Sequence, residues 1–168
     1  MPATLWEGTA EVLKQLIHAN IVVSDAERSV EFYTTALGGR VVREWVDESE
    51  TAAEALGLGI GTLKFKAYLL RWGEGGADSY PLLDIVQFIS PEAFGRPYPA
   101  MNHLGIARLC FEVDDIDATF EHVRSMGVRC LSEPKPINLR TKRGSITKVF
   151  AVYDPDGTVI ELLGPLTR

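Results

Sequence analysis

Four polar residues stand at equivalent places in the two halves of the chain. His18 and Asp84 belong to the first half, and Arg108 and Glu161 belong to the second. Asp84 lies in the run Leu-Leu-Asp-Ile-Val and Glu161 in Val-Ile-Glu-Leu-Leu. A carboxylate inside such an apolar strand is costly unless it is paired, solvated in a cavity or bound to a metal. The set therefore predicts either a metal site or a charged binding pocket.

An internal repeat with an offset of 90 residues creates this correspondence. Residues 18–25 and 108–115 are both alternating, strand-like runs that end in an acidic helix start. Because successive side chains of a strand point to opposite faces, His18 and Asn20 share the polar face of the first run. Arg108 has the equivalent place in the second run. We expect these side chains to project from sheet faces that the helices do not cover.

Each half of the chain predicts a βαβββ module, and together they predict an α+β fold with helices on one face of mixed sheets. We divide the chain into an N-terminal arm or helix at 1–14, a first module at 15–90, a proline-rich linker at 91–103 and a second module at 104–168. A capping box at Ser24 and Glu27 predicts where the first helix begins. The expected strands lie near 16–23, 40–47, 62–72, 81–89, 105–113, 128–132, 144–153 and 158–163.

The overall composition narrows the class of partner. Apolar residues make up 46% of the 168 residues and charged residues 24%, which suits an ordinary hydrophobic core. The net charge of −6 argues against a nucleic-acid partner. No apolar run approaches the roughly 20 residues that a membrane span needs, and no signal peptide is visible. We therefore expect a cytoplasmic protein with a small-molecule ligand, in which Cys110 and Cys130 are buried thiols.

Several phrases of the sequence are similar to those of one family. They are residues 18–25, Ser-Val-Glu-Phe-Tyr at 29–33, Phe-Glu-Val-Asp-Asp at 111–115 and Asp-Pro-Asp-Gly at 154–157. The chain resembles the vicinal oxygen chelate superfamily over roughly residues 15–165. That superfamily includes glyoxalase I, extradiol dioxygenases and bleomycin-resistance proteins. The resemblance implies that the sheets of two modules form a cup with the helices outside, and that a divalent metal often lies on its floor.

The resemblance also implies roles for individual residues. His18, Asp84 and Glu161 fall on metal-ligand positions, and one nitrogen with two oxygen ligands suits Mn, Fe, Ni, Co or Zn. Asp84 or Glu161 would move a proton in lyase or isomerase chemistry, or the site would support dioxygenase chemistry with iron. Arg108 departs from the pattern, because it stands where metal-binding members have a second histidine and has no lone pair to donate. Arg108 and Asn20 would then contact an anionic substrate.

Two alternatives to a metal-dependent enzyme stay open at this point. Arg108 could pair with Asp84 or Glu161 and close the site. The cup would then be a metal-free binding pocket, and the protein would be a small-molecule binding protein or an antibiotic-resistance protein. The duplicated fold could instead serve only as a dimerisation scaffold. We expect a homodimer, because the N-terminal arm and the sheet edges need covering. Whether one chain or two copies build the cup is not decided by the residues.

Overall fold

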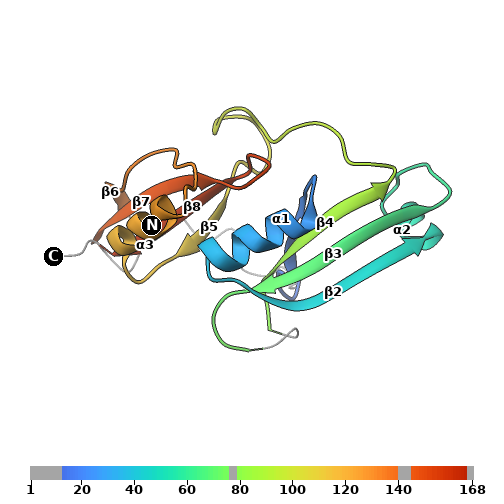
Figure 1. The fold of residues 1–168 in the computed structure, drawn as a ribbon, viewed down its shortest axis with the longest axis horizontal. Coiled ribbons are helices and arrows are strands. Elements are labelled where there is room, and N and C mark those ends of the chain that lie inside the picture. Colours follow the sequence, from blue (N-terminus) through green and yellow to red (C-terminus); the bar gives the residue numbers. More distant parts are fainter. Residues whose placement is uncertain (1–12, 76–78, 140–144, 166–168) are drawn as a thin grey trace, which may run out of the picture.

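The computed structural model describes residues 13–75, 79–139 and 145–165, and these form two four-stranded sheets (Figure 1). The first sheet has the order β1-β4-β3-β2, and the second has the equivalent order β5-β8-β7-β6. In each sheet one pair, β1 with β4 or β5 with β8, is parallel and the other pairs are antiparallel. The expected pair of βαβββ modules is confirmed. The strands are β1 (His18–Val22), β2 (Arg40–Ser49), β3 (Leu63–Arg71), β4 (Leu82–Ser90), β5 (Leu109–Glu112), β6 (Lys135–Leu139), β7 (Ser145–Tyr153) and β8 (Val159–Pro165).

Each module contains a helix between its first two strands. The first is α1 (Ala26–Glu31), which continues as the π-helical turn η1 (Phe32–Ala36), and the second is α3 (Ile116–Ser125). A short further helix, α2 (Glu50–Ala55), joins β2 to β3 and was not predicted. None of the helices in the described segments is long and apolar enough to cross a membrane.

The predicted cap of α1 is wrong by one residue. Asp25 is the N-cap, and its side chain accepts a hydrogen bond from the backbone N–H of Arg28. The hydroxyl of Ser24 donates instead to Asp156 of the second module, at 2.5 Å. Ser24 is therefore used for contact between the modules, because a carboxylate of the other module competes for its hydroxyl.

The sixth strand also lies elsewhere than predicted. Residues 128–132 contribute one isolated bridge, between Cys130 and Val152, and β6 begins at Lys135. The fifth strand, expected from residue 105, begins only at Leu109. Both cysteines are free thiols, but Cys110 is exposed rather than buried as expected.

The two modules share one hydrophobic core, and Figure 1 shows them side by side with residues 91–108 arching from one to the other. The rings of Trp72 and Phe111, one from each module, have centroids 4.6 Å apart. The hydroxyl of Tyr33, a fully buried residue of η1, donates to Asp154 of the second module at 3.1 Å. These contacts fix the modules against each other within one chain.

Candidate functional site

The first polar pair, His18 and Asp84, lies across the parallel strands β1 and β4. The register places Asn20 beside Asp84, so that these side chains and His18 share one face of the sheet. The Asn20 amide donates to Oδ2 of Asp84 at 3.0 Å, and Nε2 of His18 lies 4.0 Å from the same oxygen. The structure thus brings together three of the five residues that the sequence singled out.

Asp84 is the more buried residue of the His18–Asp84 pair. Its side chain is 13% exposed, and its Oδ1 atom is buried without a hydrogen-bond partner. Burial raises the pKa of the Asp84 carboxyl, while the Asn20 hydrogen bond and His18 act in the opposite direction. The His18 side chain is 44% exposed, so an open imidazole lies beside a carboxyl group whose other oxygen has no hydrogen-bond partner.

The second polar pair lies on the other sheet, at the equivalent strands. Nε of Arg108 is 2.7 Å from Oε2 of Glu161, with the two side chains 43% and 19% exposed. This ion pair is one of the two arrangements left open by the sequence. Because the contact is made by Nε, the terminal nitrogens of the guanidinium can still donate to a ligand.

Cys110 lies next to Glu161 in the strand register of β5 and β8. Desolvation by its neighbours and the Glu161 carboxylate raise the pKa of the Cys110 thiol to about 11. The group is therefore a neutral thiol at neutral pH, which is a poor nucleophile.

The two polar pairs do not form one site within a chain. Throughout the part of the chain that the structure describes, no three His, Cys, Asp or Glu side chains lie close enough together to hold a metal ion. His18 and Asp84 are brought together, but Glu161 is not brought to them. The set of three metal ligands that the sequence suggested is thus divided between the two sheets.

The donor atoms present fit only one half of a metal centre. The unpartnered Oδ1 of Asp84 and the open imidazole of His18 are suitable ligands. On the other sheet Arg108 has no lone pair to donate and already engages Glu161. A permanent cation beside the remaining carboxylate competes with a metal cation for it. Within one chain, the described residues therefore do not fit a complete metal centre.

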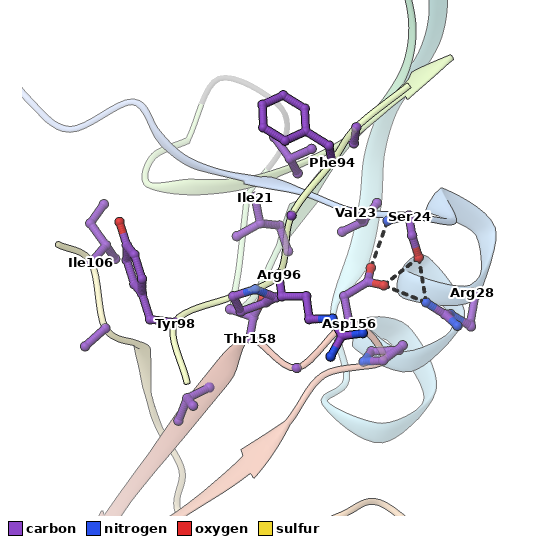
Figure 2. A pocket seen from close by; sticks show the side chains of 18 residues that line it. Ile21, Val23, Ser24, Arg28, Phe94, Arg96, Tyr98, Ile106, Asp156 and Thr158 are labelled. Carbon is purple, nitrogen blue, oxygen red and sulfur yellow. Dashed lines mark hydrogen bonds and ion pairs between the residues drawn. The ribbon is translucent and has the colours of Figure 1, made fainter. Parts of the chain in front are cut away.

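A cavity of about 780 Å³ lies elsewhere, where the linker crosses the junction of the modules (Figure 2). None of the four matched residues lines it. Ser24 and Arg28 of the first module both bind Asp156, with the Arg28 ion pair at 2.8 Å. Arg96 reaches from the linker toward the same turn, as Figure 2 shows. The sequence predicted a turn at Asp-Pro-Asp-Gly, but nothing in this motif indicated that its Asp156 joins the two modules.

A stacked pair on the second sheet was also missed. The guanidinium carbon of Arg129 lies 3.8 Å from the ring centroid of Tyr153. The position of Arg129 between the apolar Val128 and Cys130 was a usable signal, because alternation places the arginine on the face opposite the core.

Comparison with known proteins supports the same fold and names the family. The family model of the Glyoxalase/Bleomycin resistance protein/Dioxygenase superfamily matches residues 15–162. The chain belongs to this superfamily.

Curated relatives of the chain include proteins named as lactoylglutathione lyases or probable lactoylglutathione lyases. The protein of Haemophilus influenzae is 30% identical over 149 residues, which is 89% of this chain and 91% of that protein. A probable lactoylglutathione lyase of Vibrio cholerae is 29% identical over 150 residues, 89% of each chain. A probable chloroplastic lactoylglutathione lyase of Arabidopsis thaliana is 29% identical over 151 residues, and the match spans only 35% of its length.

Solved structures show the same fold at lower identity. A glyoxalase family protein of Bacillus cereus superposes with a TM-score of 0.74 at 18% identity, covering 95% of this chain and all of that one. Glyoxalase I of Leishmania major superposes with a TM-score of 0.59 at 22% identity, covering 90% and 87%. At these identities the likeness concerns the fold.

Proposed function

We propose that this protein binds a small anionic organic molecule in a cup completed by a second copy of the chain, with Arg108 as the anion anchor. The observation that carries the proposal is the ion pair of Arg108 and Glu161 on a partly open strand face. The guanidinium is always charged, and its planar fork binds carboxylate or phosphate groups with two parallel hydrogen bonds. Glu161 orients Arg108 without covering its terminal nitrogens.

The division of the polar residues between two sheets supports the second copy. Within one chain the modules are joined through Tyr33, Trp72 and Phe111 on the core side, not through the faces that carry the polar pairs. A second copy would bring the His18–Asp84 face of one chain opposite the Arg108–Glu161 face of the other. Large apolar side chains left exposed near residue 15 and in or just after the linker favour such an assembly: Leu13, Leu16, Phe94, Leu104 and Ile106.

The test is ligand binding measured by calorimetry with small carboxylates and with inorganic phosphate. We expect Arg108→Leu to weaken binding at least tenfold, because truncating a desolvated charge contact costs about 2–5 kcal/mol. Arg124→Leu is the matched control, since Arg124 is an exposed arginine of α3 whose ion pair with Glu121 lies on the helix surface. Equal affinity of the Arg108 variant and the control would contradict the proposal.

Metal-assisted lyase or isomerase chemistry is the second candidate. Two observations favour it: the unpartnered Oδ1 of Asp84 beside His18, and the kinship with lactoylglutathione lyases. His18 and Asp84 of one copy would then share the ion with Glu161 of the other, after Arg108 has released that carboxylate.

Metal analysis separates the two candidates. Protein supplied with Mn, Fe, Ni, Co and Zn should hold no stoichiometric metal if Arg108 closes the site, whereas Arg108→His should gain metal binding because it restores a ligand. Stoichiometric metal in the unmodified protein, lost in His18→Ala, together with formation of S-lactoylglutathione, would establish the second candidate instead.

A further inference from the structure

Two arginines lie in one row across the second sheet. The strand register pairs Val159 with Tyr153, and the bridge between Cys130 and Val152 places Arg129 beside Tyr153. The backbone N–H of Tyr153 donates to the carbonyl oxygen of Arg129 at 3.0 Å, which confirms that pairing. On the other side of β8, the parallel strand β5 places Leu109 opposite Ile160. Arg108, one residue before Leu109, is therefore opposite Val159. The row therefore reads Arg108, Val159, Tyr153, Arg129.

This row lies on the same face of the sheet as Glu161. Glu161 pairs with Ala151, which is two residues from Tyr153 and thus on its face. The opposite face carries Val152 and Ile160, which are fully buried in the core. Arg129 therefore projects from the face that carries the proposed anion anchor, and not toward α3.

The Arg129 side chain is fixed in place and its charge is not neutralised by a neighbour. Its guanidinium carbon lies 3.8 Å from the Tyr153 ring centroid, a cation–π contact that orients the planar group. No carboxylate in the described segments forms an ion pair with it. Arg108 by contrast has Glu161 as its partner.

The spacing of the two cations defines the length of a ligand. Glu161 holds Arg108 toward β8, and Tyr153 holds Arg129 over β7, which is the neighbouring strand. Three strand spacings of about 4.8 Å separate the two backbones, roughly 14 Å in all, and the side chains lean inward, so the guanidinium groups lie closer together than that. Val159, which is 7% exposed, is the apolar residue that lies between them in the row.

We infer that Arg129 is a second anion anchor, and that the ligands of this site are dianions whose two acidic groups flank a short apolar or aromatic body. This inference rests on the proposed role of Arg108 and extends it to the substrate class. A single carboxylate would engage one arginine, whereas a dicarboxylate of suitable length would engage both.

Calorimetry with matched probe pairs tests the inference. Adipate and terephthalate are the dianions, and hexanoate and benzoate are the monoanions of the same bodies. The unmodified protein should bind each dianion at least tenfold more tightly than its monoanion, which is the effect of one added charge-assisted contact of about 1.5–3 kcal/mol. Arg129→Leu should remove most of that preference.

Three variants make the result specific. Arg129→Lys should keep part of the preference, because it keeps the charge and loses the planar fork. Tyr153→Phe should keep all of it, because the ring that orients Arg129 is retained. Arg124→Leu again serves as the control for loss of an exposed arginine.

The failures of the two proposals differ. If Arg108→Leu abolishes binding while Arg129→Leu keeps the dianion preference, or if the unmodified protein has no such preference, Arg129 is not an anchor and the proposed function stands. If the unmodified protein binds neither class of probe, both proposals are wrong. Unchanged thermal unfolding of Arg129→Leu, expected for an exposed residue, assigns any loss of preference to the site.

Discussion

Asp84 shows how one residue can conflict with its surroundings. It is a carboxyl in the middle of β4, flanked by side chains that are almost wholly buried, and one of its oxygens has no partner. Burial disfavours the charged form, which is why the pKa of this group is raised in the folded protein. The folded state therefore binds this proton more tightly than the unfolded state does.

The pH dependence of stability follows from that direction. Stability contributed by Asp84 is full below its unfolded pKa and declines as pH rises through the interval up to the folded pKa. Asp84→Asn removes this dependence. The free energy of unfolding of the variant, relative to that of the unmodified protein, should therefore increase as pH rises from strongly acid to neutral. Urea unfolding at several pH values measures this difference. Glu121→Gln, at an exposed position on α3, should show no comparable trend. If the stability of Asp84→Asn and that of the unmodified protein change with pH in parallel, the argument is wrong.

The sequence indicated which residues deserved attention, and the contacts among them needed the structure. The repeat placed Arg108 and Glu161 at matched positions, and their ion pair was one of two stated alternatives. The hydrogen bond from Asn20 to Asp84 depends on the register of two strands that lie 64 residues apart in the chain. A register of this kind is set by packing across the whole sheet, which local patterns do not contain. The roles of these residues in chemistry stay predictions.

At the scale of elements, the sixth strand was predicted at residues 128–132, directly after the glycine that ends the helix. Proline has no N–H group and is unusual inside a strand, so Pro134 and Pro136 make the observed position hard to predict. The structure nevertheless has Pro136 in β6, paired with Lys148. β6 is an edge strand of its sheet, so it pairs with another strand on one side only. Proline is tolerated in such a strand where its missing N–H group would point away from the neighbouring strand. The position of a strand in the sheet order was the missing information.

The crossing of β8 and α3 provides a prediction at the same scale. A Cβ atom added at Gly164 would lie 2.8 Å from Cβ of Ile116 and close to Val113, so Gly164→Ala should destabilise the fold. We expect a loss of about 1–3 kcal/mol, the usual cost of overpacking a tight contact. Gly61→Ala is the matched control, because no atom lies within 4 Å of the added group. Chemical denaturation that finds both variants equally stable would show that the helix can shift away from the strand.

At the scale of the whole molecule, the two modules are joined by a buried polar contact. Tyr33 donates to Asp154, whose other oxygen accepts three backbone N–H groups of its own turn. Burial is the main reason why the pKa of Asp154 is raised, and these hydrogen bonds act against it. Burial and the neighbouring Asp154 also raise the pKa of Tyr33, so its hydroxyl stays a donor.

Removing this donor tests the joint between the modules. Tyr33→Phe leaves a buried Asp154 oxygen unsatisfied, which should lower the free energy of unfolding by about 1–3 kcal/mol. Tyr80→Phe, at a residue that is 39% exposed, should change it little. If Tyr33→Phe unfolds at the same denaturant concentration as the unmodified protein, the hydrogen bond does not hold the modules together.

The repeat predicted two equivalent modules but not how they pack against each other. Equivalent positions follow from an internal alignment, whereas the relative orientation depends on contacts such as Trp72 with Phe111 that occur once per chain. That is why the fold class was predictable and the division of the polar residues between separate sheets was not.

The proposed assembly of two copies has a direct readout. Sedimentation velocity should show a dimer at micromolar concentration, since the apolar side chains of the linker would be covered by the partner. Leu104→Glu places a charge at a residue that is 90% exposed, so it should shift the protein toward monomer without unfolding it. A monomer at every concentration of the unmodified protein would contradict the two-copy site.

If two copies complete the cup as proposed, the rigid joint between the modules gives that site an unusual property. Because Tyr33, Trp72 and Asp154 hold the modules of each chain in a fixed arrangement, the cup can open only by moving one whole copy relative to the other. Ligand affinity and self-association then become linked equilibria, in which each strengthens the other by mass action. The apparent dissociation constant for a small dianion should fall as protein concentration rises, and the same dianion should lower the concentration at which the copies associate. A cell could therefore tune the occupancy of this site through the amount of protein alone.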